Sequence, residues 1–225
     1  MTRQTRYVLG LDLGPVAAFT ALAVVERSDD LRTDDPPEYA VRHLERFPPG
    51  TPYRTVAERV LGLLSAEPLE GAPVVIDVTA VGVGVLDLFR AADYPPELMS
   101  VILTAGHNIE SGAGGLLVPK KDVVTGLQLL LQGRRLQVPT ALPDAALLAR
   151  ELGNFRSKVT LNADSSHADW REGQDDDLVF AVALACWQAG RLPSCTGPGI
   201  EVCALRRSPI TGGIYIPGVR GRVSW

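Results

Sequence analysis

The stretch that decides the fold is Tyr7-Val8-Leu9-Gly10-Leu11-Asp12-Leu13-Gly14, YVLGLDLG, near the start of the chain. Large apolar residues stand at positions 7, 9, 11 and 13, and smaller or polar residues alternate with them. A period of two is typical of a β-strand that turns one apolar face to the core. The pattern therefore predicts a strand with Asp12 near its end, on the face opposite the large apolar residues.

The next segments predict an antiparallel meander followed by alternating strands and helices. Strands are expected at 19–26 and 39–47, on either side of a polar loop at 28–38, and short connections make consecutive strands neighbours. From residue 51 the apolar period becomes helical, and a strand at 73–78, a helix around 85–89 and a strand at 99–104 follow. This alternation implies parallel pairing.

The remaining segments complete an α/β pattern. We expect a glycine-rich loop at 107–117, a helix from Pro119, a short strand at 135–138, a helix at about 143–155, a hairpin-like piece around 158–162 and a last helix from near Asp176. Three antiparallel strands, a helix, then alternating strands and helices is the order of a ribonuclease H-like fold, a mixed sheet flanked by helices. Residues 1–190 are expected to form this domain, with 191–225 as an irregular basic extension rich in Pro and Gly.

The composition is that of an ordinary globular protein. The 225 residues are 46% hydrophobic and 21% charged, which is close to average for such domains. No apolar run approaches the roughly 20 residues of a membrane span, and the N-terminus enters a strand pattern, so we expect a cytoplasmic protein without membrane contact. The three cysteines lack C-x-x-C spacing, which disfavours a disulfide framework or a zinc site.

Carboxylates stand where such a fold can bring them together. Asp12 lies toward the end of the first strand, Asp77 interrupts a hydrophobic strand, and Asp175, Asp176 and Asp177 head the apolar helix of QDDDLVFAVALA. Like charges at a few Å repel one another, and a bound divalent cation resolves that conflict. Oxygen ligands suit Mg²⁺ or Mn²⁺, and two such ions about 4 Å apart can promote phosphodiester cleavage.

Each acid also has an ordinary structural interpretation. An aspartate at a strand end is more often a turn former, and this is the better interpretation of Asp12 taken alone. Asp77 within an apolar run favours a functional role, because an unpaired buried carboxylate is costly. One aspartate at a helix start serves as N-cap, but three exceed that need. Since consecutive helical residues point about 100° apart, we expect one to cap and one or two to bind metal.

Six stretches together resemble the nuclease domain of phage terminase large subunits, the DNA-packaging motors of tailed phages. They occur in that family's order over most of residues 7–187. The stretches are YVLGLDLG, FTALAVVE, VVIDVTAVGVGVLDLFR, VPKKDVVTGLQLLLQGRRLQV, LLARELGNFRSKV and WREGQDDDLVFAVALACW.

The resemblance implies a reaction and a set of site residues. It implies endonucleolytic cutting of double-stranded DNA during packaging, leaving a 3′-hydroxyl and a 5′-phosphate, with two Mg²⁺ or Mn²⁺ ions as cofactors. It implies that Asp12, Asp77 and Asp177 are catalytic metal ligands and that Asp176 is an accessory ligand. Lys120 or Lys121, in the family-like PKKD, could contact the phosphate backbone, and a solvated lysine at a helix start is an equally good interpretation.

The sequence departs from the family in three places. Asp175 stands where the family's motif has a histidine, and the turn after Asp12 reads GPVAAF where an acid is common. No G-x-x-x-x-G-K-[ST] motif occurs in the 225 residues, so this chain is not expected to be the packaging ATPase by itself. We expect a nuclease domain expressed alone, a separately encoded nuclease subunit or a prophage remnant, with a separate packaging ATPase or portal as a possible partner.

Other functions fit parts of the sequence. A Holliday-junction resolvase-like nuclease would share the fold and would normally act as a dimer on four-way junctions. A catalytically silent interaction module would keep the fold and bind the portal or a separate motor. Gly10 to Gly14 also resembles the first phosphate-binding turn of actin-like sugar kinases, although no second such turn is present. The net charge of −4 predicts weak DNA affinity for the isolated chain.

Overall fold

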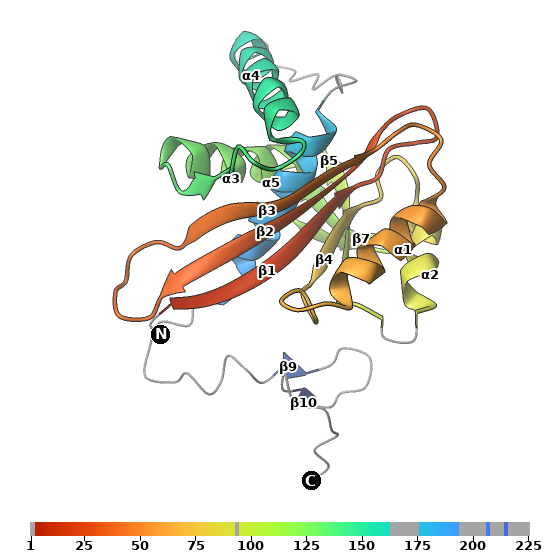
Figure 1. The fold of residues 1–225 in the computed structure, drawn as a ribbon. Helices are drawn as coiled ribbons and strands as arrows, with labels where there is room; N and C mark the ends of the chain where they lie inside the picture. Colours follow the sequence, from red (N-terminus) through yellow and green to blue (C-terminus); the bar gives the residue numbers. More distant parts are fainter. Residues whose placement is uncertain (1–2, 93–94, 163–175, 194–205, 208–213, 216–225) are drawn as a thin grey trace.

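The computed structural model describes residues 3–92, 95–162, 176–193, 206–207 and 214–215. Asp175 and most of the expected C-terminal extension lie outside these residues. Figure 1 shows a long twisted sheet with helices on both of its faces.

The sheet begins with the predicted antiparallel meander. β1 (Arg3–Asp12) pairs with β2 (Thr20–Asp30), and β2 pairs with β3 (Glu38–Phe47). The strands are longer than the apolar patterns predicted, because their polar outer ends continue the same ladder: Arg3 pairs with Asp30.

The later strands add to the sheet mainly in parallel, as the alternation predicted. β4 (Val74–Asp77) pairs in parallel with β1, and β5 (Leu98–Thr104) pairs in parallel with β4. β7 (Gly115–Pro119) continues beside β5, β6 (Glu110–Gly112) closes that edge, and β8 (Leu136–Gln137) lies beside β3. The eight-stranded order is β6-β7-β5-β4-β1-β2-β3-β8, which confirms the expected mixed sheet.

The helices divide the core into two layers. The 3-10 helix η1 (Val83–Val85) leads into α2 (Leu86–Arg90), which packs with α1 (Tyr53–Leu64) over Leu9, Leu11 and Leu13 on one face. On the other face lie α3 (Lys120–Gln132), α4 (Ala145–Asn162) and α5 (Asp177–Arg191), with Val8 beneath them (Figure 1). The alternation in YVLGLDLG thus separates the two layers as predicted.

Helix α5 lies very close to the middle of the sheet. A Cβ atom on Gly10 would stand 2.0 Å from the Ala181 carbonyl oxygen and 2.8 Å from the Ala185 nitrogen. At the far end of the helix, the buried Arg27 donates hydrogen bonds to the carbonyl oxygens of Ala189 (2.7 Å) and Leu192 (2.8 Å). α5 therefore runs antiparallel to β1, with its N-terminus at the end of the sheet where β1 and β4 finish.

Two sequence-based expectations are wrong. The expected loop at 107–117 contains the hairpin of β6 and β7. Gly115 in this hairpin (φ +130°) lies so close to Ser100 that a Cβ atom would stand 2.3 Å from the Ser100 carbonyl oxygen. The glycines there permit close strand pairing. The expected hairpin-like piece at 158–162 is helical, because α4 continues to Asn162; a five-residue alternation is too short to distinguish a strand from a helix.

The extension contributes two short described strands, β9 (Arg206–Arg207) and β10 (Ile214–Tyr215), which pair antiparallel with each other. Within the described parts of the chain, no helix is both long and apolar enough to cross a membrane.

Candidate active site

A row of residues crosses four strands at the carboxyl end of β1. Asp12 is the register partner of Asp77 on β4 and of Ala21 on β2. Ala21 is in turn the partner of Arg46 on β3. Neighbouring strands lie about 4.8 Å apart and paired residues share a face, so Asp77, Asp12 and Arg46 point to the same side of the sheet. The two strand aspartates predicted from sequence are therefore immediate neighbours.

This row lies on the face that α5 covers. Gly10, two residues before Asp12, contacts the α5 backbone at Ala181 and Ala185, and side chains two apart in a strand share a face. Asp177 begins α5, one helical turn before Ala181. The first turn of α5 thus stands at the same end of the sheet as the two strand aspartates.

The Asp77 carboxylate is buried and held by its own turn. Its Oδ1 accepts a hydrogen bond from the Thr79 backbone N–H (2.8 Å) and another from the Thr79 hydroxyl. The Thr79 Oγ1 in turn accepts from the Leu103 N–H at 2.8 Å. Asp77 is therefore a turn former, because it makes a turn of the Asx type. It is also a candidate site residue, because the carboxylate that this turn fixes is on the face covered by α5.

The start of α5 is capped by a glutamate that the sequence analysis did not single out. Asp176 occupies the N-cap position and is buried, but its side chain makes no capping hydrogen bond. Oε2 of Glu151, on α4, accepts from the backbone N–H groups of Leu178 (3.1 Å) and Val179 (3.3 Å). Among the described residues, the expected aspartate cap is therefore replaced by a carboxylate from another helix, which leaves Asp176 to other contacts.

Glu151 is wholly buried, and burial raises the pKa of its carboxyl to about 7, with the nearby negative charge of Asp177 adding to the rise. The positive charge of Arg46 and the two N–H donors act on this pKa in the opposite direction. A glutamate inside an otherwise helical pattern usually indicates a solvent-exposed position, so the sequence carried no signal for this role.

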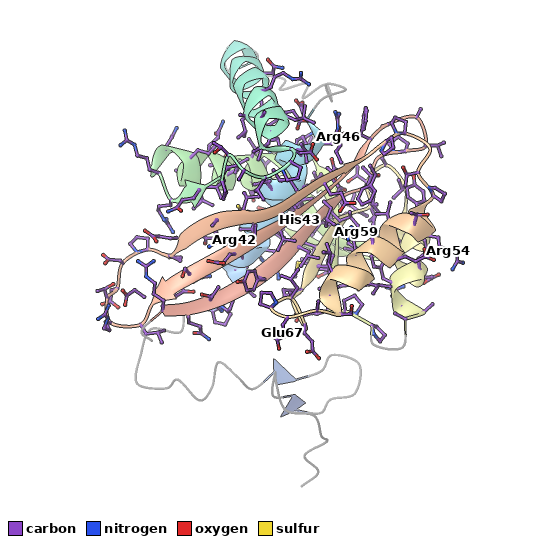
Figure 2. The ribbon with its side chains drawn as sticks, viewed as in Figure 1. Arg42, His43, Arg46, Arg54, Arg59 and Glu67 are labelled. Carbon is purple, nitrogen blue, oxygen red and sulfur yellow. The ribbon has the colours of Figure 1, made fainter. Side chains whose placement is uncertain are left out.

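Arg46 was also missed by the sequence analysis. Its Nη2 and Nε donate to Oδ2 of Asp177 at 2.6 Å and 3.2 Å, and its guanidinium lies over the Phe19 ring, 3.6 Å from the ring centre. Figure 2 shows Arg46 at the end of β3, close to the start of α5. The contact joins residues 131 positions apart, and only the strand register and the helix placement together could reveal it.

The two candidate DNA-binding lysines point to different partners. The Lys120 ammonium lies 4.4 Å from the ring centre of Phe180, in the first turn of α5. The Lys121 ammonium lies 2.7 Å from Nδ1 of His107. Both lysines begin α3, but the Lys120 side chain lies beside the start of α5, whereas the Lys121 side chain turns toward His107 in the loop before β6.

The donor set agrees with a hard divalent cation in its chemistry. Asp12 and Asp77 are adjacent carboxylates, and Asp177 is at the same end of the sheet, where it is ion-paired with Arg46. In the parts of the chain that the structure describes, no group of three or more His, Cys, Asp or Glu side chains lies close enough together to hold a metal ion. A three-carboxylate site therefore requires the side chains of Asp12, Asp77 and Asp177 to come closer together than they are here.

No family model matches the sequence, and no curated protein matches it. Solved structures do. The human cytomegalovirus terminase nuclease domain, in a manganese-soaked crystal, superimposes with a TM-score of 0.50 at 14% identity, covering 87% of this chain and 86% of that one. The same domain soaked with manganese and bound to an inhibitor gives 0.50 at 14% identity, covering 81% and 82%. The large terminase nuclease of thermophilic phage G20c with bound zinc gives 0.48 at 21% identity, covering 82% and 86%.

The likeness to the cytomegalovirus domain shows a shared fold. The ribonuclease H-like mixed sheet predicted from the order of elements is confirmed, and so is the resemblance of this chain's fold to terminase nuclease domains.

Proposed function

We propose that this chain is a metal-dependent endonuclease that cleaves double-stranded DNA in phage or prophage genome packaging, within the bacterial cytoplasm. The observation that carries the proposal is the register of Asp12 with Asp77 on adjacent parallel strands, on the face covered by the helix that begins with Asp177. The shared fold with a terminase nuclease domain supports it.

In this proposal Asp12, Asp77 and Asp177 hold two Mg²⁺ or Mn²⁺ ions, with Asp176 as an accessory ligand. When bound, such ions activate a water and stabilise the leaving oxygen of a phosphodiester. The protein's part is to hold the carboxylates in place. The Thr79 donors fix the Asp77 carboxylate, and the Glu151 cap fixes the first turn of α5.

Binding of a DNA phosphate beside the carboxylates requires a positively charged side chain nearby. Lys120 lies beside the first turn of α5 and is the better placed of the two lysines to contact a phosphate, while Lys121 lies beside His107. We propose residues 1–190 as the nuclease domain and 191–225 as an extension, with a separate packaging ATPase or portal as a partner of the chain.

The proposal is tested by nicking of supercoiled plasmid with Mn²⁺, Mg²⁺ or chelator. Wild-type protein is expected to nick with either metal and to stop with chelator, and Asp77→Ala is expected to lose nicking in every condition. Arg42→Gln is the control. Arg42, an exposed residue of β3, pairs with Glu26 of β2 and not with any of the described candidate site residues. Nicking that survives in Asp77→Ala would contradict the proposed site.

The same assay bears on two alternatives. The Arg46–Asp177 ion pair neutralises one acid without metal, which also fits a catalytically silent interaction module. Absence of cleavage with every metal, together with absence of Mn²⁺ binding, would favour that module. A four-way junction cut in preference to linear duplex would favour a resolvase-like nuclease.

A further inference from the structure

Arg46 belongs to the row of carboxylates by position. Through Ala21 it is two strands away from Asp12, which places the two Cα atoms about 10 Å apart. It therefore brings a permanent positive charge onto the face that carries Asp12 and Asp77.

The ion pair of Arg46 with Asp177 is enclosed. The exposed fractions of the two side chains are 11% and 16%, and the Phe19 ring covers the guanidinium. An enclosed carboxylate needs a compensating charge, and two donors to the same oxygen of Asp177 supply it.

The same oxygen is a natural ligand for a metal ion. In a three-carboxylate site Asp177 would bind the cation, and a carboxylate oxygen that accepts two N–H bonds from a guanidinium cannot at the same time bind a dication at full strength. The positive charge of Arg46 and that of a metal ion also repel each other at this range.

We propose that Arg46 is the resident counter-ion of Asp177 and competes with the metal for that carboxylate, so that a metal ion takes Asp177 only as Arg46 releases it. This inference rests on the proposed metal site. It makes Arg46 a positioning residue. Arg46 neutralises the Asp177 carboxylate when no metal is bound, and it thereby sets how tightly the metal binds.

The test is the Mn²⁺ affinity of the purified full chain, measured by titration calorimetry and by the electron paramagnetic resonance of free Mn²⁺. While the ion pair is formed, only a minor fraction of the molecules is ready to bind metal. Removing the pair raises the apparent Mn²⁺ affinity by the reciprocal of that fraction, for which we expect about five- to tenfold. Arg46→Gln is expected to show this gain. Its metal-free melting temperature is expected to fall, and Mn²⁺ is expected to raise that temperature more than in wild type.

Two further variants separate competition from a general charge effect. Arg42→Gln removes a positive charge from the same strand (Figure 2), where Arg42 pairs with Glu26 at 2.8 Å, and is expected to leave Mn²⁺ affinity unchanged. In an Asp177→Asn background, Arg46→Gln is expected to lose most of its effect, because the contested carboxylate is gone. Unchanged or weaker Mn²⁺ binding by Arg46→Gln, or an equal gain in the Asp177→Asn background, would overturn the inference.

A second measurement does not depend on the folding of a variant. In a crystal of the wild-type chain with Mn²⁺ bound, Asp177 Oδ2 is expected to ligate the metal and to lie beyond hydrogen-bond distance from Arg46. A metal site that leaves the Arg46–Asp177 pair intact would also overturn the inference. Nicking by wild type with no affinity gain in Arg46→Gln would refute this inference alone, whereas an affinity gain without any nicking would refute the nuclease proposal alone.

Discussion

Gly10 determines how closely α5 can approach the sheet. Any side chain there would start 2.0 Å from the Ala181 carbonyl oxygen, and that oxygen belongs to helix backbone that cannot turn aside. A glycine in mid-strand otherwise weakens a strand, so its presence here is explained by the close approach of α5, which brings Asp177 to the level of Asp12.

Gly10→Ala is expected to lower the free energy of unfolding by about 3 kcal/mol, as overpacking at a backbone contact does. Gly62→Ala is the matched control, because Gly62 lies within α1 with nothing near its Cβ position; it is expected to stabilise by about 0.5–1 kcal/mol. Urea unfolding of both variants measures the difference. Equal stabilities of the two would show that α5 does not rest on β1 as described.

Among single residues, the sequence singled out Asp12 and Asp77 but not Arg46 and Glu151, which contact the first turn of α5. Asp12 and Asp77 could be proposed from sequence because a carboxylate inside an apolar strand conflicts with its surroundings, and the structure makes them register partners. Arg46 and Glu151 carried no such conflict, since a charged residue at a strand end or within a helix is ordinary. Their roles arise from contacts over 131 and 27 positions of sequence separation.

At the level of helices and strands, α5 is held by side-chain hydrogen bonds at both ends. The Glu151 carboxyl group accepts from the N–H groups of Leu178 and Val179 in the first turn, and the Arg27 guanidinium donates to the carbonyl oxygens of Ala189 and Leu192 at the other end. Positive charge at a helix C-terminus also interacts favourably with the helix dipole. The helix that carries Asp176 and Asp177 is therefore fixed in position along its whole length.

The Glu151 cap makes stability depend on pH. The carboxyl has a folded-state pKa of about 7, against 4.5 for the ordinary group, so the folded state holds its proton to higher pH than the unfolded state does. Stability is then lost as pH rises from about 5 to about 8, by on the order of 2–3 kcal/mol. Glu151→Gln keeps an oxygen acceptor and has no charge, so its stability is expected to fall less over this range.

Urea unfolding at the two ends of this pH range measures the effect. Glu58→Gln, on the exposed face of α1, is the control and is expected to keep the wild-type pH dependence. Identical pH dependence in Glu151→Gln and wild type would show that the buried carboxyl titrates as an ordinary one.

Among the elements, the apolar patterns predicted the three meander strands, β4, β5 and the start of α5. They failed for β6 and β7, where glycine replaces the apolar alternation and pairing with β5 decides the structure. They also failed for the last turns of α4, where a short alternation imitated a strand. The first error occurs where strand pairing overrides local preference, and the second occurs because a five-residue pattern is too short to distinguish a strand from a helix.

For the whole molecule, net charge limits how DNA can be bound. At −4 the chain offers little general attraction to a polyanion, and we expect duplex binding in the range of about 10⁻⁴–10⁻⁶ M that weakens further with salt. Recruitment by a packaging partner would then supply local concentration. Fluorescence anisotropy of a labelled duplex across a salt series measures this, and tight binding that salt does not weaken would contradict it.

We propose that Asp12 and Asp77, at the ends of β1 and β4, hold the metal. The most direct measurement is anomalous diffraction from crystals of the full chain soaked in Mn²⁺. We expect an anomalous peak ligated by both Asp12 and Asp77, with Asp177 completing the site. A peak that touches neither strand aspartate, or no peak in crystals of a protein that cuts DNA with Mn²⁺, would contradict it.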